Sequence, residues 1–155
     1  ESIARGQALF EDAGRGNCAS CHGTAGRGDG VAVYVTDPET GALRVDKRDD
    51  WGHDIMPRNI PQGIFRGGRR PIDIYRRIYA GINGTPMPAL GDSKDPDGNP
   101  LLSAEDLWAL VHYVGYLSEQ GPDPGAHRAA QAGAHAPAGE PAHAEEHGSQ
   151  HEEGR

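Results

Sequence analysis

The chain contains only two cysteines, Cys18 and Cys21, and His22 directly follows the second. A disulfide across so short a loop would stabilise the fold very little, so the pair indicates a functional site. The spacing Cys-x-x-Cys-His is that of covalent haem attachment. Cysteines at this spacing can form thioethers with the two vinyl groups along one haem edge, and the next residue then presents its imidazole to the iron. We therefore expect these three residues to hold one haem c.

Two other uses of a Cys-x-x-Cys pair fit the sequence less well. A thioredoxin-like redox pair would follow a strand and precede a helix, whereas residues 23–30 are rich in glycine and predict a loop. A tetrahedral zinc site would need two further ligands in a compact pattern, and the chain has no other cysteine.

The iron of such a haem needs a second axial ligand unless that position stays open, and only two methionines are present. Met87 lies between two prolines that stiffen its loop, and two glycines shortly before it let the backbone approach the ring closely. Met56 lacks this setting, and either methionine could instead fill a gap in the core. His53 or His112 would give a bis-histidine iron. We expect Met87 to be the second axial ligand. Ligation by one histidine and one methionine raises the reduction potential of haem iron.

Three segments show the apolar spacing of helices. The first covers residues 2–10, with Ser2 as a possible cap. The second runs from a proline at 71 to just before Gly81. The third, roughly 104–118, has the strongest apolar face and follows a Ser103–Asp106 pair that resembles a capping box. Between them, residues 31–46 predict a small hairpin or an irregular loop.

The composition changes near residue 120, where Ala, Gly, Pro, His and Glu replace almost all large apolar side chains. Such a segment cannot bury enough apolar surface to offset its ordering entropy. We expect one domain at 1–119 and a disordered tail at 120–155. The histidines of the tail could bind Zn, Cu or Ni weakly; they are His127, His135, His143, His147 and His151.

Bulk properties narrow the class of protein. The net charge of −8 argues against nucleic-acid binding, and no apolar run approaches the ~20 residues of a membrane span. Hydrophobic residues make up 35% of the chain, below the roughly 45–50% of ordinary domains. A loop-rich domain of this size has a small hydrophobic core, and a large apolar cofactor would fill it.

These features resemble class I bacterial cytochromes c over roughly residues 1–118. Gly6 and Phe10 match the N-terminal helix of that family, and Leu110 and Tyr113 match its C-terminal helix. The resemblance implies an all-α cytochrome c fold, with three to five helices and long loops around one covalently bound haem. In that fold the two terminal helices cross at right angles, and the glycine permits close contact. The segment 23–56 is longer than in compact members.

The resemblance also implies roles for individual residues. Cys18, Cys21 and His22 match the attachment motif and Met87 the axial methionine. The stretch beginning at Pro57 looks like the family's Gly-Pro-Asn-Leu segment, where the proline carbonyl accepts a hydrogen bond from the axial histidine and so orients it. A protein of this kind transfers single electrons between redox partners and is not an enzyme. It works outside the cytoplasm, in the periplasm if the source is bacterial.

Several side chains could contact the haem propionates. We expect at least one of Arg66, Arg69 and Arg70 to pair with a propionate, while other arginines make a positive docking patch; a solvated surface is the alternative. Trp51 could donate its indole N–H to a propionate or simply pack. Three functions stay open: a soluble electron shuttle, a haem domain or subunit of a larger oxidoreductase, and a haem enzyme with an open or labile sixth site.

Overall fold

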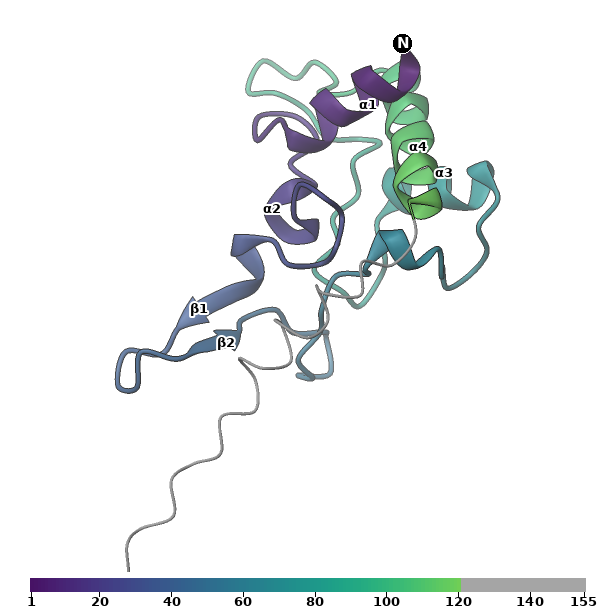
Figure 1. The fold of residues 1–155 in the computed structure, drawn as a ribbon. Coiled ribbons are helices and arrows are strands. Elements are labelled where there is room, and N and C mark those ends of the chain that lie inside the picture. Colours follow the sequence, from purple (N-terminus) through teal and green to yellow (C-terminus); the bar gives the residue numbers. More distant parts are fainter. Residues whose placement is uncertain (121–155) are drawn as a thin grey trace, which may run out of the picture.

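A computed structural model describes residues 1–120 of the chain (Figure 1). Residues 121–155, which contain nearly all of the predicted tail and its histidines, lie outside the described part. Most of the regular secondary structure in the described part is helical, which confirms the predicted all-α class. Its helices and strands are α1 (Ser2–Glu11), α2 (Ala19–His22), β1 (Tyr34–Thr36), β2 (Leu43–Val45), α3 (Pro71–Ala80) and α4 (Ala104–Glu119), with 3₁₀ turns at Val31–Val33 and Ile60–Gln62.

The three predicted helices are confirmed, and so is the hairpin. Strands β1 and β2 pair antiparallel, with Tyr34 opposite Val45, so the hairpin rather than the irregular loop is present in segment 31–46. The predicted cap of α1 is wrong: Ser2 lies inside the helix, and Glu1 precedes it without a side-chain cap. The Ser2 hydroxyl instead bonds His112 Nδ1 across to α4, at 2.7 Å.

The core lies where α1 crosses α4, and α3 packs on the other side of α4 (Figure 1). Phe10 of α1 and Leu110 of α4 are almost fully buried, and the Phe10 ring meets Tyr113 edge-on with ring centroids 5.3 Å apart. None of the helices formed by residues 1–120 is both long and apolar enough to cross a membrane. The long segments between helices run over this core and carry the residues of the candidate site.

Asp106 ties the start of α4 to the N-terminal part of the chain. The predicted capping box is confirmed, since the Asp106 backbone N–H donates to the Ser103 hydroxyl at 3.1 Å and the Ser103 N–H donates to the Asp106 carboxylate at 3.0 Å. The same carboxylate pairs with Arg5 of α1 at 2.7 Å and with Arg15 at 2.8 Å. Arg15 lies just before the cysteine motif, so this carboxylate fixes the segment that leads into the motif.

We expect the stability of the fold to depend on the charge of Asp106. Burial raises the pKa of this carboxyl, but the hydrogen bonds from Ser103 and the two arginines outweigh it and lower the pKa from 3.8 to about 2. A lowered pKa stabilises the fold above the unfolded value and ceases to do so as the pH falls through the folded value. This contribution of about 2 kcal/mol is therefore present above pH ~4 and lost towards pH ~2.

Asp106→Asn should lower the free energy of unfolding at neutral pH by about 2 kcal/mol. It should also flatten the loss of stability between pH ~4 and ~2. Denaturant titrations of the haem-loaded protein at several pH values measure both effects. Asp97→Asn, at an exposed position in a turn, is the matched control and should behave as wild type. An Asp106→Asn variant with the wild-type pH profile would contradict the assignment.

Candidate functional site

The cysteine motif forms a helical turn of its own, α2. The His22 N–H donates to the Cys18 carbonyl at 2.8 Å, and the loop that follows folds back so that the Gly30 N–H donates to the Cys21 carbonyl at 3.0 Å. Residues three and four positions apart lie on one face of a helix. The turn therefore brings both thiols and the His22 imidazole to the same side of the chain, as attachment along one haem edge requires.

Both thiols are free and partly buried in this structure. Cys18 packs against the hydrophobic core. Burial raises the pKa of the Cys18 thiol to about 12, because a thiolate would lose its hydration there. A thioether carries no charge, so the same burial does not disfavour a thioether at this sulfur.

The His22 ring is partly buried, with its centroid 6.3 Å from that of Phe10. Its Nδ1 lies 3.2 Å from the Arg58 carbonyl oxygen. A carbonyl can only accept, so Nδ1 carries the proton and Nε2 presents its lone pair. Burial lowers the pKa of His22 and favours the neutral imidazole, which is the form that ligates a metal.

The acceptor that His22 bonds is not the one that the family resemblance implied. The family resemblance assigned this role to the Pro57 carbonyl, but the structure assigns it to Arg58, the next residue. The Pro57 carbonyl oxygen instead faces the Gly28 backbone, closely enough that a β-carbon on Gly28 would lie 2.5 Å from it. The two consecutive carbonyls therefore face different partners, and only that of Arg58 faces the imidazole.

Met87 lies in the loop that follows α3, residues 81–90, which we call the Met87 loop. The Ile82 N–H donates to the Met87 carbonyl at 3.3 Å, and the Leu90 N–H returns to the Ile78 carbonyl of α3 at 3.1 Å. Met87 is partly buried and packs against the same core cluster as Cys18. The fold thus places this thioether and the motif, far apart in sequence, on one hydrophobic cluster.

Of the alternative axial ligands, the two histidines form other hydrogen bonds and the methionine is exposed. His53 bonds Asp49, with Nδ1 and the carboxylate oxygen 3.3 Å apart, and His112 bonds Ser2. Met56 is 44% exposed. Within residues 1–120, no group of three or more His, Cys, Asp and Glu side chains could hold a metal ion.

The predicted propionate partners differ in their surroundings. Arg70 donates from two nitrogens to Asp73, at 2.8 and 2.9 Å, at the start of α3. Arg66 and Arg69 are exposed. Trp51 is 75% exposed and lies against Gly84 of the Met87 loop. The sequence predicts these four as candidate propionate partners, whereas the Arg70–Asp73 pair and the Trp51–Gly84 contact come from the structure.

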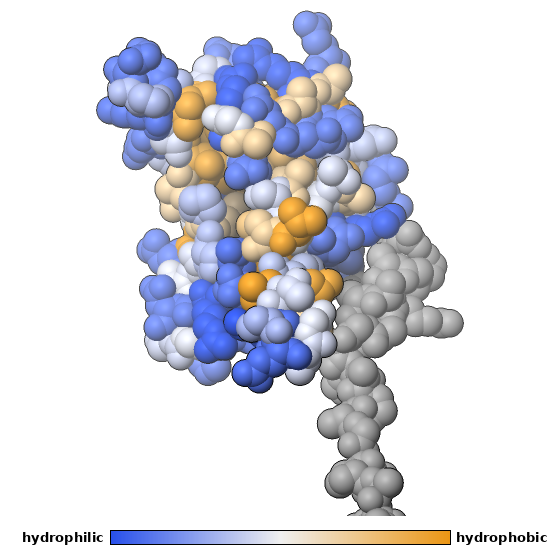
Figure 2. Space-filling model, turned by 90° about the vertical axis from the view of Figure 1, so that its left-hand side faces the viewer, coloured by the Kyte–Doolittle hydropathy of each residue, from blue (hydrophilic) through white to orange (hydrophobic). Residues whose placement is uncertain are grey.

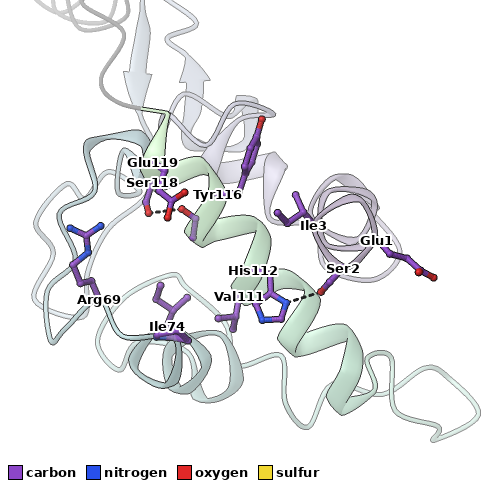
Figure 3. Close-up of a pocket in the computed structure, with 12 residues that line it drawn as sticks. Glu1, Ser2, Ile3, Arg69, Ile74, Val111, His112, Tyr116, Ser118 and Glu119 are labelled. Carbon is purple, nitrogen blue, oxygen red and sulfur yellow. Dashed lines mark hydrogen bonds between the residues drawn. The ribbon is translucent and has the colours of Figure 1, made fainter.

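A groove of about 570 Å³ lies beside α4, near the start of α1 and α3, and Figure 3 shows the side chains that line it. Ile74 and Val111 form part of its wall, with Arg69, Glu119 and the bonded pair Ser2–His112 around them. The lining contains none of the two cysteines, His22 or Met87. This groove is therefore separate from the candidate site at the cysteine motif.

The residues around the motif fit a haem in their chemistry. Imidazole nitrogen and thioether sulfur are axial ligands of haem iron, and two thiols are available for its vinyl groups. Partly exposed apolar side chains pack on the same core cluster as Cys18 and Met87, including Phe65, Tyr75 and Leu90. Figure 2 shows apolar residues across the middle of the side towards which α2 and the hairpin lie, with more hydrophilic ends above and below. A flat apolar ring would cover such a surface.

Comparisons with known proteins show which family and fold the chain resembles. The family model for cytochrome c matches residues 3–118. A solved chain from the reducing HAO-like protein complex of Kuenenia stuttgartiensis is 34% identical, with a TM-score of 0.58. The match covers 76% of this chain and 44% of that one, so the chain spans less than half the length of this structural relative. No curated protein gave a significant match.

Proposed function

The chain belongs to the cytochrome c family, and from this we propose that it carries single electrons on one haem c, with His22 and Met87 as the axial ligands. Family membership itself makes the chain a haem-binding electron-transfer protein that has redox partners. The observation that carries the finer proposal is the helical turn α2, which brings Cys18, Cys21 and His22 to one face. Met87 packs against the cluster that Cys18 also contacts.

Each residue of the proposed site has a separate task. Haem c, when bound, supplies an iron that gains or loses one electron. His22 offers Nε2, while the Arg58 carbonyl holds its Nδ1–H, fixes the ring and raises its basicity. Met87 offers a sulfur that raises the potential of the iron. If His22 and Met87 both held the iron, no open position would be left for a substrate, so we propose a carrier and not an enzyme.

Charge around the haem edge belongs to the same proposal. We propose that at least one of Arg66, Arg69 and Arg70 neutralises a propionate. Arg66 is the best candidate for this role, because Arg70 is already paired with Asp73 and Arg69 lines the groove of Figure 3. We also propose that the protein works outside the cytoplasm, in the periplasm if its source is bacterial, where its redox partners meet it.

A second candidate is a haem domain or subunit of a larger oxidoreductase. The structural relative is a chain of a protein complex and is more than twice as long as the matched region, which favours this reading. Size-exclusion chromatography of the native material separates the two candidates. A shuttle elutes at the mass of the single chain, whereas a subunit elutes with its partners.

Met87→Leu tests the proposed ligand directly. The oxidised wild-type protein should show the long-wavelength charge-transfer band that a methionine–iron bond produces, and this variant should lose the band completely. Its reduced form should bind carbon monoxide rapidly and its reduction potential should fall, since the sulfur ligand raises it. Met56→Leu is the control and should keep the band. A wild-type protein that lacks the band and binds carbon monoxide rapidly would instead support a haem enzyme with an open site.

A further inference from the structure

A short turn at residues 49–53, here called the Asp49 turn, lies beside the Met87 loop. The Asp49 N–H donates to the His53 carbonyl at 3.0 Å, which closes the turn. The Asp49 carboxylate accepts from the backbone N–H groups of Trp51 and His53, at 3.0 and 2.9 Å. These bonds keep the turn in one shape without help from the core, so it can act as a fixed support for whatever it touches.

The Asp49 turn touches the Met87 loop at Gly84. The Asp50 N–H donates to the Gly84 carbonyl at 3.0 Å. The outer edge of the Trp51 six-membered ring lies over the Gly84 backbone, so that a β-carbon on Gly84 would stand 2.9 Å from two ring carbons. Gly84 also has a φ of +78°, which side chains other than glycine rarely adopt. Both the contact and the conformation therefore require glycine here.

Packing of the core does not explain the position of Trp51. The residue is 75% exposed, so its burial stabilises the fold little. The ring contact uses the edge opposite the indole N–H, which leaves that donor outside the contact. What the contact does is restrict a glycine-containing loop, and such a loop has many open conformations to lose. Restricting it raises the fraction of time that Met87 stays where it packs.

We propose that the Asp49 turn, acting through Trp51, braces the Met87 loop in its ligating conformation and so sets how often the methionine leaves the iron. The proposal rests on the proposed function, in which Met87 is the axial ligand. Trp51 is in this account a positioning residue that acts through Gly84. Trp51 lies in the segment 23–56, and the proposal gives this segment a role.

The test is the rate at which imidazole binds to the oxidised, haem-loaded full chain. At saturating imidazole this rate is limited by departure of the methionine. Trp51→Ala should raise the limiting rate about fivefold, as expected when one contact of ordinary strength is lost. Gly84→Ala should raise it at least as much, because its methyl group would displace Trp51. In the double variant the effect of Gly84→Ala should be smaller than in the wild-type background.

Gly41→Ala is the matched control. Gly41 also has a positive φ, +70°, but a β-carbon there meets nothing within 4 Å. It imposes similar backbone strain away from the Met87 loop and should leave the imidazole rate unchanged. The proposal is contradicted if Trp51→Ala leaves the limiting rate unchanged. It is also contradicted if Trp51→Ala and Gly84→Ala act independently on that rate. A wild-type protein without the methionine–iron band would overturn the proposed function instead, so the two failures are distinguishable.

Discussion

Replacing both Cys18 and Cys21 with serine is expected to abolish covalent haem attachment. Serine cannot form a thioether with a vinyl group, and a single bond from His22 to iron does not survive acid. Haem should therefore pass entirely into the solvent on acid–acetone extraction, whereas wild-type protein should keep all of it. Either single substitution should leave one thioether and hence attached haem. Haem staining of a denaturing gel, together with intact mass, measures the result.

Ser20→Ala is the control inside the same motif. Ser20 donates its hydroxyl to the Asn17 carbonyl at 2.7 Å but supplies no thiol, so this variant should attach haem as wild type does. Haem that stays bound to the double serine variant after extraction would contradict the assignment of the two thiols. Loss of haem in Ser20→Ala alone would show that the shape of the turn, rather than the thiols, decides attachment.

Gly6→Ala should be among the most destabilising single substitutions in the domain. A β-carbon at Gly6 would overlap the Ala109 carbonyl oxygen of α4 and would stand 2.7 Å from the Tyr113 β-carbon. Backbone cannot move aside as a flexible side chain can, so α1 and α4 would have to separate. We expect the free energy of unfolding of the haem-loaded protein to fall by about 3 kcal/mol, measured by denaturant titration.

Gly115→Ala makes the same chemical change in a different setting. Gly115 lies within α4, and a β-carbon there meets nothing within 4 Å. Because alanine favours the helix over glycine, this variant should be more stable by about 0.5–1 kcal/mol. Equal stability of the Gly6→Ala variant and the wild type would mean that the two helices do not cross as closely as described.

Local signals in the sequence were sufficient for much of the fold. A proline at 71 and a glycine at 81 bound α3, and the Ser103–Asp106 box begins α4, because capping depends on neighbouring residues alone. The close approach of α1 to α4 was implied by the family resemblance through Gly6. The motif itself carried the haem assignment, since its spacing is a chemical requirement of attachment.

Local signals in the sequence do not predict contacts between loops that are far apart along the chain. The choice between the Pro57 and Arg58 carbonyls depends on how the segment at 57–60 turns against the glycine-rich loop. The sequence predicts that at least one of Arg66, Arg69 and Arg70 pairs with a propionate, but it does not choose among them. In the structure Asp73, three residues after Arg70, holds the Arg70 guanidinium. That i, i+3 pair was visible in the sequence and would have signalled competition.

The segment 23–56 illustrates the same limit. Its exposed tryptophan gave no periodic pattern, and only the structure places Trp51 on Gly84. The paired aspartate and histidine at 49 and 53 were a weak signal of a closed turn, since aspartate side chains often bond backbone N–H groups two residues on. Nothing in that pattern named the loop that the turn would meet.

The most direct test of the central claim is mass spectrometry of one tryptic peptide. Cleavage after Arg15 and Arg27 releases the segment 16–27, which contains both cysteines and His22. Protein from a host that attaches haem c should yield this peptide with the mass of one added haem and with neither thiol open to alkylation. A peptide of unmodified mass, with both thiols alkylated, would contradict the account.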